Sequence, residues 1–343
     1  MKGIDFATSA VFALAVKVLR RQGIHIDGVP LEAALCADAP IALPAAGQRA
    51  VLAAVLAEHG PLPLLRVGEV VAQHGQQPLL QALLAARSGP ELIQRCLRLE
   101  RYASTRHRTQ VERLEDDMAE LQRVAVNGIR PDPAEELLAL GIQIGLLRAI
   151  GCADVTAELG DHRIARGCSG WDEAAARRVA RSVARSVAAS APWRLAWKPP
   201  TSRVHTTAAE PDDSGAAPAE VALVTATLRH DPAQTIQIDR VAQRLGLGSR
   251  TLQRRLAAHG VTLSSIGRAV RVRHACSLLI TGDEPLPVVG FASGFSDQPH
   301  FTRTFHRQTG LTPRSYRVLA GEQGWLAGVE RLAHGHRGGG SWV

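Results

Sequence analysis

Apolar residues recur at helical spacing along most of the first two hundred positions of the chain. Apolar positions three or four residues apart predict helices that bury one face, whereas strict alternation predicts strands. The predicted helices are Phe6–Arg21, Gln48–His59, Leu64–His74, Pro78–Ala86, Glu91–Tyr102, a segment from Pro131 to Ile150, and Asp172–Ala189. The predicted strands are His107–Leu114, Glu120–Val126, Val155–Leu159 and Trp193–Trp197. We therefore expect an α+β domain over residues 1–198.

From residue 219 to residue 320 the spacing of apolar residues is helical throughout. The predicted helices are Ala219–Arg229, Ile238–Leu245, Ser249–His259, Ser264–Leu279, Pro285–Ser293, Gln298–Thr309 and Pro313–Leu319. An all-α domain over residues 220–320 is therefore expected to follow the α+β domain.

Two segments are predicted to lie outside the folded domains. Residues 199–219 read PPTSRVHTTAAEPDDSGAAPA, a composition that buries too little apolar surface to offset the entropy of ordering the chain. Residues 321–343 end in a run that includes Gly338, Gly339 and Gly340, as is common in frayed chain ends. The sequence predicts a flexible linker over 199–219 and a flexible tail over 321–343.

A repeated unit stands out within the predicted all-α domain. Ser249–His259 carries Leu252 and Leu256 four residues apart, and Gln298–Thr309 carries Phe301 and Phe305 at the same spacing. Each helix follows a shorter apolar helix and a glycine turn, and the offset is about 48 residues. A helix that packs on one face and carries polar residues on the other is how a DNA-recognition helix is built. We expect two helix-turn-helix units.

The charge distribution agrees with a polyanionic partner. The chain has a formal net charge of +8 and a pI near 9.9. Residues 221–320 alone contain 13 arginines against 5 acidic residues, a net of +8. The excess positive charge is therefore confined to the predicted all-α domain, as expected of a nucleic-acid-binding module.

The five cysteines form no Cys-x-x-Cys pair, which favours reduced thiols over a disulfide framework or a zinc site. No run of residues is long enough to span a bilayer, and Arg20 and Arg21 follow the first apolar segment, on the wrong side for a signal peptide. We expect a cytoplasmic protein with no membrane association.

The carboxyl-terminal domain resembles the AraC/XylS type of bacterial transcription regulators over roughly residues 221–320. The residues that carry the resemblance are Gly294–Asp297, Phe301–Phe305, Thr309–Pro313, Tyr316-Arg317, Leu252–Leu256, Gly260, Arg271, Ala275 and Leu278-Leu279. The amino-terminal domain is similar to the arabinose-binding-domain type of sensor that some members carry. That likeness rests on Leu99, Arg101, Tyr102, the hairpin after them and the helix from Pro131 to Ile150, and it does not extend past Gly160.

The resemblance assigns DNA-reading positions to both predicted recognition helices. These are Arg250, Gln253 and Arg254 in the first, and Gln298, His300, Thr302 and Arg303 in the second. Their chemistry fits, because arginine pairs with guanine, glutamine with adenine, and threonine can contact thymine. Arg255, Arg268 and Arg307 are expected to contact phosphates, which sets affinity without reading sequence.

Three residues of the second unit depart from the expected pattern. Gly290 stands where the family usually has alanine, at a cost of about 1 kcal/mol in a helix. Pro287 lies early in its helix, where proline is tolerated, and Pro299 occupies a usual contact position without a donor. We expect the second unit to bind more weakly or to read fewer bases than the first.

Other candidate chemistry has structural interpretations. His300 and His306 lie six apart with no nearby cysteine, so no metal site is predicted. Asp116-Asp117 and Glu135-Glu136 are interpreted as a hairpin turn and a helix N-terminus. Cys168 lacks the surroundings of a nucleophile. Trp193 and Trp197 are interpreted as core residues, with a ligand pocket as the alternative.

Together these patterns predict a sequence-specific transcription regulator that is not an enzyme and needs no cofactor. The resemblance implies an activator that recruits RNA polymerase at promoter DNA, with an amino-terminal domain that binds an unidentified small-molecule effector, forms a homodimer, or both. The alternatives are a ligand-independent repressor, an architectural DNA-binding protein with a purely dimerising amino-terminal domain, and an enzyme fused to a DNA-binding domain. The last would need a cysteine cluster or a nucleophile motif that the sequence lacks.

Overall fold

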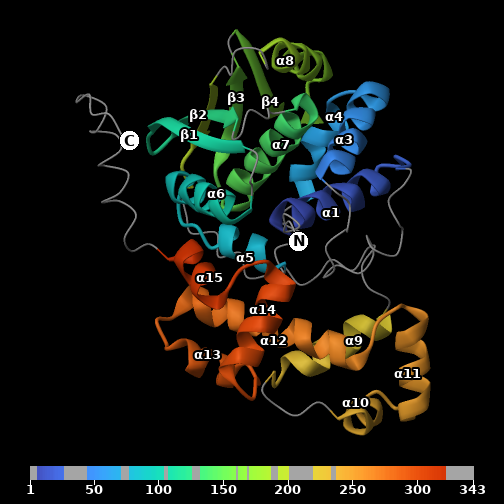
Figure 1. Ribbon diagram of the computed structural model, residues 1–343. Coiled ribbons are helices and arrows are strands. Elements are labelled where there is room, and N and C mark those ends of the chain that lie inside the picture. Colours follow the sequence, from blue (N-terminus) through green and yellow to red (C-terminus); the bar gives the residue numbers. More distant parts are fainter. Residues whose placement is uncertain are drawn as a thin grey trace.

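The structure is a computed structural model, and it describes residues 6–26, 45–70, 77–103, 107–125, 132–159, 161–167, 170–186, 192–200, 219–232 and 237–321. Most of the predicted linker and tail therefore lies outside the described residues. The described part has an upper region of helices around a sheet and a lower region made only of helices (Figure 1). This confirms the α+β class of the first and the all-α class of the second.

The upper region, residues 6–200, combines eight helices and six strands among its described residues. The helices are α1 (Phe6–Arg21), α3 (Ala45–His59), α4 (Leu62–Arg66), the 3-10 helix η1 (Val67–Val70), α5 (Pro78–Leu84), α6 (Gly89–Ala103), α7 (Pro133–Ala149) and α8 (Glu173–Ser186). The strands are β1 (His107–Leu114), β2 (Met118–Ala125), β3 (Ala153–Leu159), β4 (His162–Gly167), β5 (Gly170–Trp171) and β6 (Trp193–Lys198).

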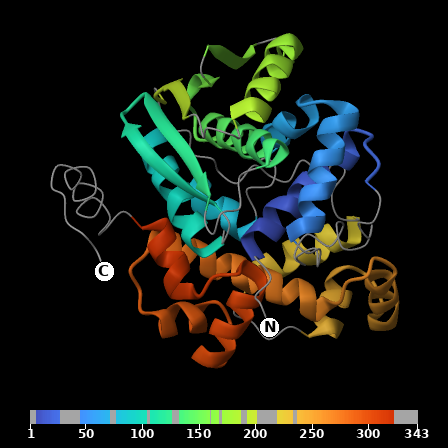
Figure 2. The same ribbon diagram turned by 45° about the horizontal axis from the view of Figure 1, so that its top comes forward.

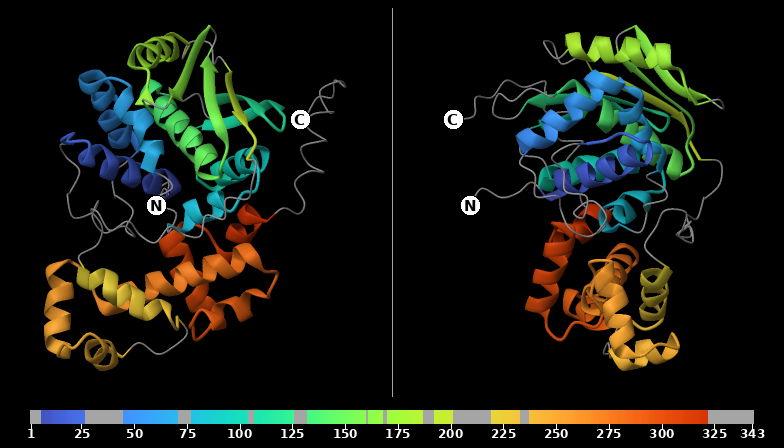
Figure 3. Two further views of the ribbon diagram at one scale, coloured as in Figure 1. Left: turned by 180° about the vertical axis from the view of Figure 1, so that it is seen from behind. Right: turned by 90° about the vertical axis from the view of Figure 1, so that its right-hand side faces the viewer.

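The strands form one antiparallel sheet in the order β1-β2-β6-β3-β4-β5. Helices cover one of its faces, as the side view shows (Figure 3). Trp193, Leu195 and Trp197 of β6 point into this covered face and are buried in the core, which confirms their interpretation as core residues. The face away from the helices carries alternating charge. Arg113, Glu120, Arg194, Glu158 and Arg163 occupy paired positions across five neighbouring strands.

Two sequence predictions for the upper region need correction. The predicted helix Leu64–His74 is broken, because α4 ends at Arg66 and η1 occupies Val67–Val70, while residues 71–76 lie outside the described part. The break brings Gly68 against the backbone of Gly141 in α7. Strands β4 and β5 were not predicted, because β4 is short and contains two arginines and a glycine, and β5 has only two residues, one of them glycine. Cys168, between them, lies outside the described residues.

The carboxylates considered for catalysis have structural roles. Asp116 and Asp117 lie in the turn between β1 and β2, as expected. Glu136 lies near the helix N-terminus, as expected, and it also forms a buried ion pair. It is 7% exposed, and its Oε1 lies 2.7 Å from Arg123 Nη1. Its Oε2 also accepts a hydrogen bond from Trp193 Nε1 at 3.3 Å. Burial raises the pKa of Glu136, and the nearby Arg123 opposes this shift.

The lower region contains seven helices among its described residues, all close to their predicted positions. They are α9 (Ala219–Arg229), α10 (Ile238–Arg244), α11 (Ser249–Ala258), α12 (Leu263–Thr281), α13 (Leu286–Ala292), α14 (Gln298–Thr309) and α15 (Pro313–Ala320). Helix α12 runs through the middle, with α9, α10 and α11 toward one end and α13, α14 and α15 toward the other (Figures 1 and 2).

Helix α12 contributes to two separate cores. Its first half packs with α9, α10 and α11 around a cluster that includes Leu252, Leu256, Ile266 and Val270. Its second half packs with α13, α14 and α15 around a cluster that includes Phe301, Phe305 and Tyr316. A single rigid helix therefore joins the two helix pairs.

Candidate nucleic-acid interface

The first helix pair, α10 and α11, presents a polar face to solvent. Leu252 and Leu256 are fully buried because their four-residue spacing places them on one face of α11. Gly246 makes the turn between the helices with a φ of +65°, a conformation that favours glycine. Arg250, Gln253 and Arg254 are all exposed. Among the described residues neither arginine forms a salt bridge, so their guanidinium groups remain available to an outside acceptor.

The second helix pair, α13 and α14, repeats this plan. Phe301 and Phe305 are fully buried, and Gly294 makes the turn with a φ of +82°. Of the predicted DNA-reading residues on α14, Gln298 and Arg303 are exposed, whereas His300 and Thr302 are only half-buried. The side chains proposed to read bases therefore lie on the polar side of their helix, with less exposure than on α11.

His300 is tied to the protein at the start of α14. Its ring packs edge-on against Phe295, with the ring centroids 5.5 Å apart. Its backbone N–H donates to Asp297 Oδ1 at 2.7 Å, which caps the helix. This hydrogen bond, with a second one from Ser296, lowers the pKa of Asp297. The imidazole is thus held in place by packing before any ligand arrives.

The departures in the second unit have physical explanations. A Cβ at Gly290 would lie 2.9 Å from Cδ1 of Phe301, so the missing methyl group makes room for the aromatic ring. Pro287 lies in the first turn of α13, where its missing N–H breaks no helical hydrogen bond, as predicted. Pro299 is exposed near the start of α14.

The three predicted phosphate contacts differ in their surroundings. Arg268 on α12 and Arg307 on α14 are exposed. Arg255 is also exposed, but its Nη1 lies 3.3 Å from Glu220 Oε1 on α9. A phosphate at Arg255 would therefore compete with a surface ion pair, which is a weak competitor.

The sequence did not reveal a contact between the two regions. Helix α5 of the upper region lies against α12 and α15, and its Leu79 and Ala82 belong to the same core as Phe305 and Tyr316 (Figure 1). The Tyr316 hydroxyl donates to the Pro78 carbonyl at 2.6 Å. Gln81 Nε2 donates to Ser277 Oγ at 2.8 Å. These partners are about two hundred residues apart, so no local pattern could have paired them.

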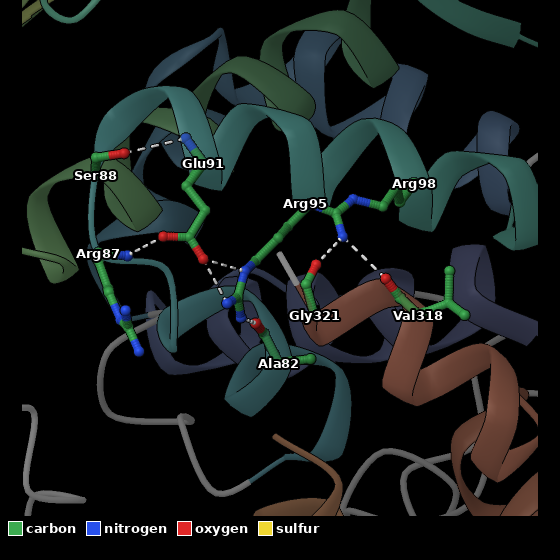
Figure 4. A network of polar contacts seen from close by, with 8 residues as sticks. All are labelled: Ala82, Arg87, Ser88, Glu91, Arg95, Arg98, Val318 and Gly321. Carbon is green, nitrogen blue, oxygen red and sulfur yellow. Dashed lines mark hydrogen bonds and ion pairs between the residues drawn. The ribbon is translucent and has the colours of Figure 1, made fainter. Parts of the chain in front are cut away.

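Two arginines of α6 reinforce this contact. Arg98 is 6% exposed, and its Nη1 donates to the carbonyl of Val318 at 2.9 Å and to the carbonyl of Gly321. Arg95 holds the adjoining turn by donating to the Ala82 carbonyl and pairing with Glu91 (Figure 4). Arg98 thus satisfies carbonyls at the end of α15 that have no helical partner.

The cysteines and histidines of the described residues show no reactive or metal-binding arrangement. Burial raises the pKa of Cys96 and of Cys276 to about 12 and that of Cys152 to about 11, so these thiols stay neutral at physiological pH. The described residues include no group of three or more metal-ligating side chains. Within the same residues no single helix has the length and apolar character to cross a membrane, although the bent pair Ala46–His59 and Leu62–Val70 meets both criteria together.

Comparison with known proteins identifies the lower region. A protein-family model described as a helix-turn-helix domain matches residues 241–318, which run from α10 into α15. The transcriptional activator RhaS of Escherichia fergusonii is 34% identical over 86 residues, which make up 25% of this chain and 31% of RhaS. The ornithine utilization regulator of Pseudomonas aeruginosa is 33% identical over 86 residues, 25% of each chain. The regulator VirS of Mycobacterium tuberculosis is 32% identical over 93 residues, 27% of each chain.

A solved AraC-type regulator from Chromobacterium violaceum matches with a TM-score of 0.29 and 24% identity, over 31% of this chain and 95% of that one. The curated relatives match this chain over 25% to 31% of their own lengths. Residues 241–318 therefore match a helix-turn-helix domain, and this part of the chain is similar to the regulators RhaS and VirS.

Proposed function

We propose that this chain, whose residues 241–318 match a helix-turn-helix domain, is an AraC-type transcription regulator that binds promoter DNA through two recognition helices, α11 and α14. In this proposal, α10–α11 and α13–α14 are two helix-turn-helix units, and the rigid α12 spaces them so that both enter successive major grooves on one side of the duplex. The observation that carries the proposal is the repeated pairing of a buried anchor face with an exposed polar face on the second helix of each pair.

The side chains on the exposed faces of these helices fall into base-reading and phosphate-binding groups. Arg250, Gln253 and Arg254 would read bases from the first unit, and Gln298, His300, Thr302 and Arg303 from the second. Arg255, Arg268 and Arg307 would bind phosphates. Because His300 and Thr302 are half-buried and Pro299 has no N–H donor, the second unit would contribute less base discrimination than the first.

In the same proposal, residues 1–198 form an effector-sensing or dimerising domain of the arabinose-binding type, residues 199–219 a linker, residues 220–320 the DNA-binding domain and residues 321–343 a tail. The protein would act in the cytoplasm as an effector-responsive activator that contacts RNA polymerase. The contact of α5 and α6 with α12 and α15 supports regulation of the second unit by the first domain, because it joins the two through a shared core.

The test is binding to promoter DNA taken from upstream of the gene itself and of its neighbours. In a gel-shift titration across salt concentrations, replacement of both Arg250 and Arg254 by alanine should weaken specific binding by about 2–6 kcal/mol, at about 1–3 kcal/mol for each base contact. Replacement of the exposed Arg181 on α8 by alanine serves as the matched control and should change nothing.

Two results would count against the proposal. Unchanged affinity and unchanged base preference in the double variant would remove the gene-control assignment. Equal affinity of the wild-type protein for promoter and scrambled DNA would favour the alternative, an architectural binder with a purely dimerising amino-terminal domain.

A further inference from the structure

Helix α13 exposes an apolar surface in the lower region. Among the described residues four large apolar side chains are exposed, and two of them lie on this helix, Phe291 at 79% and Val288 at 48%. Pro287 and Ala292 beside them are exposed as well. Because positions 287, 288, 291 and 292 share one face of a helix, these residues form a single surface, which we call the α13 patch.

The first helix pair shows that a helix in this place does not need an apolar outer face. An offset of 48 residues aligns Val241 and Ala242 of α10 with Val289 and Gly290 of α13, and all four are buried. The same offset aligns the patch with four exposed polar residues of α10, which are Asp239, Arg240, Gln243 and Arg244. Helix α13 contains no charged residue at all. Packing within a helix pair therefore does not explain the patch, which has the character of a surface that another element covers.

The chain carries a segment that suits this patch, a few residues beyond α15. Residues 325–333 read WLAGVERLA and lie outside the described part. The apolar positions are i, i+1, i+4, i+7 and i+8, occupied by Trp325, Leu326, Val329, Leu332 and Ala333. This spacing gives a helix one apolar face, and such a face laid on an apolar surface is a common mode of recognition. Nine residues that include Gly328 make a poor helix alone in water, so the order of this segment would depend on docking.

The segment begins within reach of the patch. Helices α13 and α15 both pack on the second half of α12 (Figure 1). Arg317 Nη2 of α15 donates to the carbonyl of Glu284, which lies two residues before the start of α13 at Leu286. The described part ends at Gly321, one helical turn after Arg317, whose carbonyl accepts the Gly321 N–H at 2.8 Å. The four residues from there to Trp325 can span about 14 Å, which exceeds the length of about 10 Å of α13.

We propose that residues 325–333 fold as a helix against the α13 patch of the same chain, with the Phe291 ring packed among the apolar residues of this segment. Docking would remove from water the most exposed of the large apolar side chains in the described part. It would also cover the side of α13 that faces away from the core of the second helix pair. Residues past the segment, including Gly338, Gly339 and Gly340, would keep the flexible character predicted for the tail. The proposal does not depend on DNA binding.

The experiment is hydrogen exchange, followed by mass spectrometry, on the full-length protein without DNA. The reference for unprotected rates is a synthetic peptide of residues 322–343. In the wild type we expect the amides of residues 329–333 to exchange at least about tenfold more slowly than in the peptide, since a docked helix closes their hydrogen bonds. The amides of residues 338–341 should exchange as fast as in the peptide.

Variants on both sides of the contact then identify it. Phe291→Ser should bring residues 329–333 to the peptide rate, and the double variant Trp325→Ser and Leu326→Ser should do the same. Leu223→Ser is the matched control for the patch, because Leu223 is a large apolar residue of α9 that is 53% exposed. Trp342→Ser is the matched control within the tail. Both controls should leave the protection unchanged, and the melting temperature of each variant checks folding.

Dilution distinguishes the chain's own tail from other occupants. A segment tethered by a few residues has an effective concentration in the millimolar range, so its protection should not change on about fiftyfold dilution of the protein. Protection that disappears on dilution would overturn the proposal and show that a second copy covers the patch. The proposal also fails if residues 329–333 exchange at the peptide rate in the wild type, or if Phe291→Ser leaves their exchange unchanged.

Discussion

The two helix pairs of the lower region share a plan but differ in what holds them. The first pair packs against α9 and half of α12 with aliphatic side chains such as Val224, Leu252 and Leu256. The second pair packs around a column of aromatic rings, with neighbouring centroids of Phe301, Phe305 and Tyr316 separated by 5.6 Å and 5.3 Å. Among the residues that the structure describes, only the second core also includes residues of the upper region, Leu79 and Ala82 of α5.

The two helix pairs are therefore suited to different tasks, one to reading bases and the other to contact with the upper region. The first pair has the more exposed set of candidate base-reading side chains and a core of its own. The second pair has a less exposed set and a core that continues into the other region. The comparison suggests that the first pair supplies most of the base discrimination, while the second is where the upper region can act.

The largest expected effect comes from emptying each core in turn. Phe305→Ala should lower the free energy of unfolding by about 3–5 kcal/mol, and Leu256→Ala by about 2–5 kcal/mol. Hydrogen exchange should separate them, because Phe305→Ala should raise exchange in α5 as well as in α14, whereas Leu256→Ala should raise it in α10 and α11 and leave α5 protected. Faster exchange in α5 in both variants would show that the two cores are not independent.

A second prediction concerns the glycine that faces an aromatic ring. Gly290→Ala should lower the free energy of unfolding by about 1–3 kcal/mol although alanine is the better helix former, because the Phe301 ring is held by Phe295 and Phe305 and cannot give way. Gly282→Ala is the control, since its Cβ would meet only the Leu278 carbonyl oxygen, at an ordinary 3.5 Å. Urea denaturation measures both, and a stabilised Gly290→Ala protein would contradict the packing explanation.

The contact between regions predicts a smaller effect. Tyr316→Phe keeps the aromatic column and removes the hydroxyl that donates to the Pro78 carbonyl and that also interacts with the Cys276 thiol. The hydrogen bond to Pro78 is worth about 0.5–1.5 kcal/mol. Exchange of the amides in α5 should rise, while those of α10 and α11 should not change. If α5 remains as protected as in the wild type, the hydroxyl does not contribute to holding the regions together.

The smallest predicted effect is a pH dependence at the start of α14. The pKa of Asp297 is lowered in the folded protein, so its contribution to stability is present above the unfolded value of about 3.9 and is lost as the pH falls through the folded value. Asp297→Asn keeps a capping side chain and removes this titration. The difference in unfolding free energy between the two proteins should shrink below about pH 4, and a difference that stays constant with pH would contradict the role of the carboxylate.

The sequence predicted the lower region well, because its helices are amphipathic and glycine or proline residues mark many of their ends. The bounds of α9 and α14 agree with prediction, and the other helices differ from it by at most two residues at either end. Each helix there is specified by neighbours three and four positions away, which is what periodicity reports.

What depends on distant neighbours could not be predicted. The break between α4 and η1 accompanies the close approach of Gly68 to Gly141, and Trp171 Nε1 of β5 donates to Glu69 Oε1 of η1 across about a hundred positions of the chain. Arg98 lies on a predicted helix, where a charged side chain is usually exposed to solvent. In the structure it is buried and donates to carbonyls more than two hundred positions away in the chain. Periodicity identifies which face of a helix is covered but not what covers it.

The shared core also bears on how this protein can be divided. A fragment that starts at Ala219 would keep every predicted base contact but would uncover the patch that Leu79 and Ala82 occupy. The apolar residues of α12 and α15 that pack against α5 would then lie next to water, and the Tyr316 hydroxyl would lose the Pro78 carbonyl as its acceptor. Such a fragment would self-associate through this newly exposed apolar patch. Its measured DNA affinity would then describe an artificial oligomer rather than the intact protein.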